Sequence, residues 1–266
     1  MIRALARAGL AFDRPDWIAM ARAAFDFVTA EMQQDGRLAH SWCQGAARHP
    51  ASLDDYANMA SAALALYEVT ADPAIFEQVL AWLDVVRTHH GDPEGDGFFF
   101  SADDTRGLVA RLKSANDSAI PAGNGTLVEV FARLHALTGD VAHRQAAERQ
   151  IKAFSGEITR NFFSLSALLN GADLLLSPVQ VILVGPPQAA ETAALIRAAA
   201  APSLPSRILT RLAPDDVLAD THPAAGKTMI EDRPTAYVCV GPVYSAPVTD
   251  PDALQSRLRD LRPAQP

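Results

Sequence analysis

The chain has 266 residues, 49% of them hydrophobic, which is enough to bury one large core or two small ones. Its formal net charge of −8 argues against binding to a nucleic-acid backbone, because such binding needs a basic surface. Apolar runs stay shorter than the roughly 18 residues of a membrane span, so we expect neither a nucleic-acid nor a membrane partner.

The opening residues 1–8 are amphipathic but show neither a helix cap nor the pattern of a signal peptide. They resemble the middle of a helix, so we expect sequence upstream of them. Apolar residues at helical spacing then predict a series of helices. These cover residues 17–32, 54–69, 74–88, 127–137, 141–154 and 162–176.

Short loops ending in an N-cap Asp separate two pairs of these helices, at residues 70–73 and 138–140. This is weak internal repetition of an αα-hairpin, with a period of roughly 60 residues. Hairpins of this kind form a toroid when they curve into a ring and a solenoid when they stack linearly.

The pattern changes after Pro178. A β-branched run over 179–185 predicts a buried strand, and residues 189–200 predict a helix. Two further strands and a closing helix are expected at 208–212, 235–241 and 250–261. Strand–helix–strand order predicts a small, mostly parallel sheet. The expected fold is therefore mainly α, with a partial α/α toroid over residues 1–176 and a small α/β subdomain over 177–266.

The two cysteines, Cys43 and Cys239, are far apart and neither belongs to a CxxC motif. We therefore expect no disulfide framework, no thiol redox chemistry and a cytoplasmic location. Both side chains are expected to be small buried hydrophobic groups. Pro186 and Pro187 follow the strand glycine where a phosphate-binding motif would need more glycines, so no nucleotide cofactor is expected.

Four segments resemble the C-terminal part of thioredoxin domain-containing proteins of the spermatogenesis-associated protein 20 type. They are MIRALARAG at 1–9, LDDYA at 53–57 with LYEVT at 66–70, GFFF at 97–100 with NDSAIPAGN at 116–124, and YVC at 237–239 with APVT at 246–249. The resemblance implies a six-hairpin, glycosidase-like toroid behind an N-terminal thioredoxin domain, which has no counterpart here. The chain departs from that pattern at Cys43, Ala122 and Tyr244, where the family has Arg, Ser and a second tail cysteine.

Acidic residues at the predicted helix starts are the first candidates for chemistry. Asp54 and Asp55 precede Tyr56, and Asp117 could face Asp55 across the mouth of a toroid, with Asn124 beside it. A carboxylate pair about 5–9 Å apart is the geometry of glycosidases. The alternative for each acid is a structural one, in which it caps a helix or binds loop amides.

His40 and Trp42 form a second candidate, because a ring can stack on a sugar while a histidine moves a proton. The alternative is a partly buried loop pair. The sequence thus predicts Asp55, Asp117 and His40 as catalytic residues. Trp42, Asp54, Tyr56 and Asn124 are predicted to bind substrate.

No metal site is expected. The acidic loop 91–97 has the composition of a calcium loop but not its register, and His89-His90 has no third ligand at metal spacing.

Three functions remain open from the sequence. The first is hydrolysis or epimerisation of a small carbohydrate by the loop carboxylates. The second is a non-catalytic module that binds a partner through an exposed apolar edge. In the third, the chain is an incomplete part of a larger thioredoxin-domain protein, which forms a homo-oligomer or needs the missing N-terminal half in trans.

Overall fold

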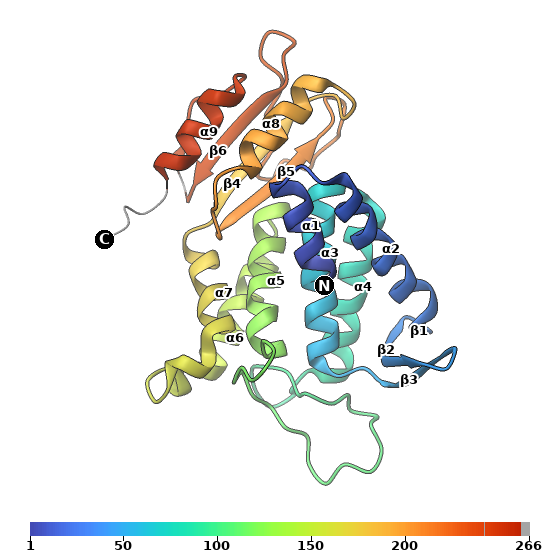
Figure 1. Ribbon diagram of the computed structural model, residues 1–266. Coiled ribbons are helices and arrows are strands. Elements are labelled where there is room, and N and C mark those ends of the chain that lie inside the picture. Colours follow the sequence, from blue (N-terminus) through green and yellow to red (C-terminus); the bar gives the residue numbers. More distant parts are fainter. Residues whose placement is uncertain (242, 262–266) are drawn as a thin grey trace.

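Helices make up most of the first two thirds of the chain, and a small sheet with two helices follows (Figure 1). The computed structural model describes residues 1–241 and 243–261, apart from the side chains of Val243 and Tyr244. Tyr244, one of the positions at which the sequence differs from the family pattern, therefore lies outside the described side chains. Within the described residues, no helix combines the length and hydrophobicity needed to cross a bilayer.

The first part consists of helical hairpins in two layers. One layer places α1, α3, α5 and α7 side by side in that order, and α2, α4 and α6 each pack against the helix before them (Figure 1). The helices are α1 (Ile2–Ala11), α2 (Pro15–Glu31), α3 (Leu53–Thr70), α4 (Pro73–Val85), α5 (Gly123–Thr138), α6 (Val141–Ile158) and α7 (Ser166–Leu176), with a π-helical turn at Val86–His90 and a 3-10 turn at Phe162–Leu165.

Local capping explains where several helices begin. The side chains of Asp72 and Asp140 accept hydrogen bonds from the second amide of α4 and α6, at 3.0 and 2.8 Å. Ser52 and Asp55 form a capping box at the start of α3. Such caps satisfy amides that have no partner inside the helix, which is why these boundaries were predictable from short motifs.

Helix α5 is the centre of the helical core, and its residues Leu127, Phe131 and Leu134 are fully buried. Its backbone approaches that of α7 closely, because two glycines lie at the contact. A Cβ on Gly125 would lie 2.8 Å from the Leu168 nitrogen, and a Cβ on Gly171 would lie 2.7 Å from the Glu129 nitrogen. Larger residues at either position would push the two helices apart.

The second part is a four-stranded sheet of order β5-β4-β6-β7, with α8 (Ala190–Ala200) and α9 (Pro251–Asp260) packed together on it. The strands are β4 (Val179–Val184), β5 (Arg207–Leu212), β6 (Thr235–Val240) and β7 (Val243–Tyr244). Only β4 and β5 are parallel, whereas β4–β6 and β6–β7 are antiparallel. The expectation of a mostly parallel sheet was wrong, because turns rather than a crossover helix connect β5 to β6.

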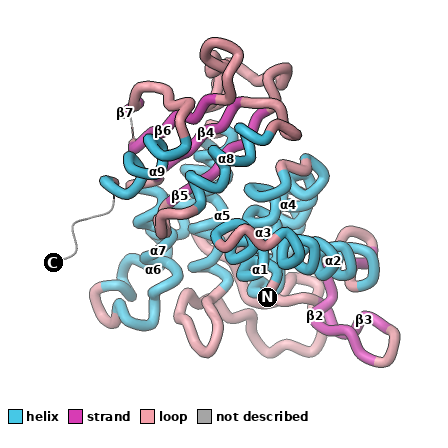
Figure 2. The backbone as a smooth tube through the Cα atoms, turned by 45° about the horizontal axis from the view of Figure 1, so that its top comes forward, coloured by secondary structure: helices cyan, strands magenta, loops and turns pink. Residues whose placement is uncertain are grey.

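A small three-stranded antiparallel sheet lies between α2 and α3, in a segment expected to be loop, and its β2–β3 hairpin projects from the helices. It contains β1 (Gln33–Gln34), β2 (Arg37–Cys43) and β3 (Ala46–Pro50), so His40 and Trp42 lie on a strand. The two residues between β2 and β3, Gln44 and Gly45, both have positive φ, as type I′ hairpin turns require. This hairpin lies away from the four-stranded sheet (Figures 1 and 2).

The cysteine expectation was half correct. Cys239 is buried, as predicted, but Cys43 is exposed at the end of β2. The division at residues 176 and 177 stays a prediction. The main hydrophobic cores separate near it, but Ile208 of β5 belongs to the helical core.

Candidate functional site

Two predicted acidic residues meet at the N-terminal end of α5. Asp54 Oδ1 accepts a hydrogen bond from the Gly123 amide at 2.7 Å, and Asp117 Oδ1 accepts one from the Ala122 amide at 2.9 Å. Because these amides are consecutive, the two carboxylates are close neighbours. Burial raises the pKa of Asp54, and the nearby charges of Asp55 and Asp117 raise it further.

Asp55 forms a second contact, with His40 of the hairpin. Asp55 Oδ2 accepts hydrogen bonds from Ser52 N and Oγ at 2.7 and 2.8 Å, and it lies 2.9 Å from His40 Nδ1. The hydrogen bond to Asp55 raises the pKa of the exposed His40. The structure thus pairs His40 with Asp55, and it pairs Asp54 with Asp117.

Asp117 also connects the start of α5 to the start of α7. Its Oδ2 accepts a hydrogen bond from the Ala167 amide in α7 at 2.8 Å, and its own amide donates to the Ser164 carbonyl at 2.6 Å. Both carboxylate oxygens therefore bind amides, which is the structural alternative recognised from the sequence. A catalytic role for Asp117, Asp55 or His40 stays a prediction.

Three predicted substrate-binding residues already contact other parts of the protein. The Tyr56 side chain is buried and its hydroxyl accepts a hydrogen bond from Leu38 N at 3.0 Å. Asn124 is buried and binds both backbone groups of Phe98 at 2.9 Å. Trp42 packs edge-on against Phe27 with ring centroids 5.4 Å apart. The binding roles of these residues stay predictions.

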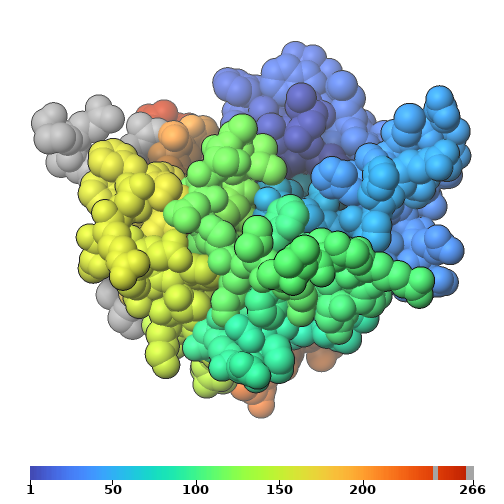
Figure 3. All heavy atoms as spheres, turned by 90° about the horizontal axis from the view of Figure 1, so that it is seen from below, coloured from blue at the N-terminus to red at the C-terminus, as the bar shows by residue number. Residues whose placement is uncertain are grey.

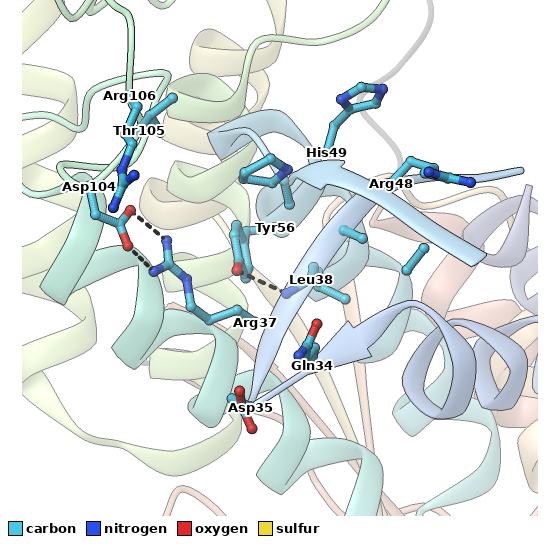
Figure 4. Close-up of a pocket in the computed structure, with 14 residues that line it drawn as sticks. Gln34, Asp35, Arg37, Leu38, Arg48, His49, Tyr56, Asp104, Thr105 and Arg106 are labelled. Carbon is cyan, nitrogen blue, oxygen red and sulfur yellow. Dashed lines mark hydrogen bonds and ion pairs between the residues drawn. The ribbon is translucent and has the colours of Figure 1, made fainter.

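A cavity of about 630 Å³ lies between the hairpin and residues 104–106 (Figure 4). Arg37 of β2 and Asp104 of the loop point toward each other there, and both guanidinium nitrogens contact the carboxylate, one at 3.0 Å. Of the predicted site residues, only Tyr56 lines this cavity. The predicted carboxylates therefore do not line this cavity.

The fold also brings two acids to His89, although no third ligand was visible near it in the sequence. Ligand atoms of His89, Asp103 and Asp104 lie within 4.8 Å of one another. These groups already have partners, because His89 Nδ1 lies 2.9 Å from Asp103 and Asp104 binds Arg37. The grouping alone assigns no metal.

A buried ion cluster was not predicted from the sequence. Arg133 of α5 is only 2% exposed, and its guanidinium lies 2.7 Å from Glu68 of α3 and 3.0 Å from Glu129 of α5. Burial alone would raise the pKa of Glu129, but the surrounding arginines outweigh it and lower that pKa. The local signal was a Glu and an Arg four residues apart in a mostly apolar helix.

The same cluster joins the helices to the sheet. Arg3 of α1 lies 2.7 Å from Glu129, and Glu68 Oε2 accepts a hydrogen bond from the Leu209 amide of β5 at 3.2 Å. Burial, together with Arg133 and Arg3, lowers the pKa of Arg7 to about 10. We call Glu68, Glu129 and Arg133 the charged joint, because they connect α1, α3, α5 and β5.

The sequence has relatives among known proteins, although no family model matches it. It is 29% identical over 218 residues to spermatogenesis-associated protein 20 of Homo sapiens, and 28% identical to the proteins of that name in Rattus norvegicus and Mus musculus. Each match covers 77% of this chain and 27% of the relative. The chain thus spans about a quarter of the length of these curated relatives and is distantly homologous to part of spermatogenesis-associated protein 20.

Proposed function

We propose that this chain is a non-catalytic module of helical hairpins that binds a thioredoxin-domain polypeptide. The observation that carries the proposal is a set of exposed apolar side chains at the end of the helices opposite the sheet. Val109 is fully exposed, Leu112 is 72% exposed and Phe163 is 78% exposed. Large apolar side chains exposed at one end of a protein are a common feature of protein interaction sites.

These side chains come from separate segments that meet at one end of the molecule. Residues 91–122 spread across that end, and the segment after α6 lies beside them (Figure 3). The rings of Phe162 and Phe163 stack on each other, with centroids 4.5 Å apart. This end therefore offers a partner the exposed apolar side chains of a long, otherwise polar loop and a stacked aromatic pair.

The arrangement of the helices supports a related proposal about the whole fold. Helices α1, α3, α5 and α7 form one layer, and α2, α4 and α6 form the other. Alternation between two layers is what successive hairpins of an α/α toroid would show. We infer that these two layers of helices form an arc of such a ring. The resemblance supports this inference, as does the match to only about a quarter of the length of the relatives.

The partner proposal can be tested by mixing the purified chain with a thioredoxin-domain polypeptide from the same organism. Size-exclusion chromatography with light scattering should detect a complex, and Leu112→Asp or Phe163→Asp should abolish it, because each buries a charge at the contact. Val217→Asp is the control, since Val217 is even more exposed than Leu112 and Phe163 but lies in the loop after β5. A wild-type chain that stays free, or a control as damaging as Leu112→Asp, would remove the proposal.

A second proposal is hydrolysis or epimerisation of a carbohydrate, with Asp54 as the acid. Within the described residues, no hydrogen bond reaches Asp54 Oδ2, and the pKa of Asp54 is raised by burial next to Asp117. A carboxyl group with a raised pKa can donate a proton near neutral pH. The His40–Asp55 pair at the start of the same helix would then serve as the second proton-transfer group.

This proposal predicts turnover of nitrophenyl glycosides, or epimerisation of reducing sugars observed by NMR. Asp54→Asn and Asp117→Asn should each lower the rate at least tenfold, as is usual for acid–base residues. Asp26→Asn on α2 is the control, because this exposed acid only pairs with Arg22. Absence of any turnover, or full activity in Asp54→Asn, would exclude a carbohydrate-active role.

A further inference from the structure

A cavity of about 480 Å³ lies where the sheet meets the helical layer. It opens at the carboxyl ends of β4 and β5, with Gly185 and Ala213 directly after the two strands, and Tyr67 of α3 forms the opposite wall. These strands are the parallel pair of the sheet, with Val184 opposite Leu212. In α/β sheets, ligands bind outside the carboxyl ends of parallel strands.

One wall of the cavity contains a buried hydroxyl without a partner. Thr192, the third residue of α8, is 5% exposed, and its Oγ1 has no hydrogen-bond partner within the described chain. Gly185 leaves room beside it, because a Cβ there would lie 2.6 Å from Oγ1. Buried polar groups of this kind are rarely left unsatisfied unless something absent from the free protein binds them.

The cavity also contains a cation without a carboxylate partner. Arg211 of β5 donates a hydrogen bond to the Val69 carbonyl, and among the described residues no carboxylate lies within ion-pair distance of it. Asp216 lines the same cavity, but its Oδ2 already accepts a hydrogen bond from the Ala213 amide at 2.8 Å. Burial without a counter-charge lowers the pKa of Arg211.

The start of α8 adds to this positive character. Its N-cap is Ala189, which has no side-chain oxygen to bind the free amides of the first turn. The partial positive charge of a helix N-terminus favours an anion, and here it lies beside the Thr192 hydroxyl. The remaining walls combine apolar side chains, among them Tyr67, Leu212 and Leu218, with polar residues such as Thr210 and His222.

We propose that this cavity binds a small organic anion, with its charged group at Arg211 and Thr192 and its apolar body against Tyr67, Leu212 and Leu218. A mostly apolar hollow with a few convergent polar groups is the usual form of a small-molecule site. The site is separate from the exposed apolar end of the helices, so it stands whether or not a polypeptide binds there.

The test uses 8-anilinonaphthalene-1-sulfonate as a probe, because it combines one negative charge with an aromatic body. Fluorescence titration of the full chain should show saturable binding of one probe molecule. Arg211→Gln should weaken binding about tenfold or more, since it removes a charge-assisted contact. Thr192→Val should weaken it a few-fold, because it replaces the hydroxyl with a methyl group of similar shape.

Two further variants keep the test decisive. Ala213→Phe fills the cavity while retaining Arg211, so it should abolish binding even if Arg211→Gln does not fold. Arg197→Gln removes an exposed charge from the last turn of α8 and should bind the probe as the wild type does. Binding that survives Ala213→Phe, or that falls equally in Arg197→Gln, would overturn the proposal.

Competition identifies the charged group. Benzoate and phenyl phosphate carry the same ring with a carboxylate or a phosphate, and the stronger competitor reveals which head group the site prefers. Either result supports the proposal. Displacement by cyclohexanol as effective as that by both anions would show that charge is not recognised, and would overturn it.

Discussion

Replacing Arg133 with methionine would test whether the charged joint holds the two parts of the molecule together. The substitution keeps a long side chain in α5 but removes the cation between Glu68 and Glu129, which lie 2.7 and 3.0 Å from it. Two largely buried carboxylates then lose their central counter-charge. Removing one partner from a buried ion pair costs about 3–5 kcal/mol, a large share of the roughly 5–15 kcal/mol that stabilises a typical domain.

Urea denaturation followed by circular dichroism measures this loss. With a slope near 3 kcal/mol per M, the midpoint for Arg133→Met should fall by roughly 1–2 M. Arg144→Met is the control, because Arg144 forms an exposed pair with Glu148 on α6 that should contribute about 0.5 kcal/mol or less. If Arg133→Met unfolds within 1 kcal/mol of this control, the joint does not stabilise the fold.

The same substitution should change the response to acid. The arginines hold the pKa of Glu129 below its usual value in the folded state. The stability that the arginines add through Glu129 is therefore fully present above the pKa that Glu129 has in the unfolded state. It is lost as the pH falls through the lower pKa that Glu129 has in the folded state. Without Arg133 the pKa of Glu129 rises, so acid unfolding should begin at a higher pH than in the wild type. An unchanged acid midpoint would contradict this linkage.

Three further outcomes follow from side-chain environments. Asn124→Ala should destabilise the fold by about 2–4 kcal/mol in the same urea assay, because it leaves the buried backbone groups it binds unpaired; a loss below 1 kcal/mol would argue against this clamp. The pKa of His40, followed by NMR, should lie above that of an ordinary histidine and fall in Asp55→Asn, and equal values in both proteins would disprove the pairing. A thiol reagent should modify the exposed Cys43 at once and the buried Cys239 only after unfolding, so two fast thiols would be inconsistent with the structure.

The sequence singled out Asp54, Asp55 and Asp117 as candidates, but it did not predict the contacts that each of them makes. The sequence predicted that Asp117 would face Asp55, whereas the structure places Asp117 beside Asp54 and gives Asp55 to His40. A helix start predicts which acids lie near one another. Neighbouring residues of a helix point in different directions, so Asp54 and Asp55 meet different partners. The packing of α3 against α5 and against the hairpin decides which partner each of them meets.

The amino-acid sequence by itself determined where most helices lie, and it determined the starts of α4 and α6 closely, because apolar spacing and caps such as Asp72 and Asp140 act within one or two turns. The start of α5 and the end of α6 each lie four residues from the predicted position. Only the tertiary structure decided three features: the direction of β6, the contact between His40 and Asp55, and the ion pair between Glu68 and Arg133. His40 and Asp55 are 15 positions apart and Glu68 and Arg133 are 65 positions apart, so these contacts exist only once the elements have packed together. Local patterns determine elements, whereas contacts between distant residues depend on how those elements fit.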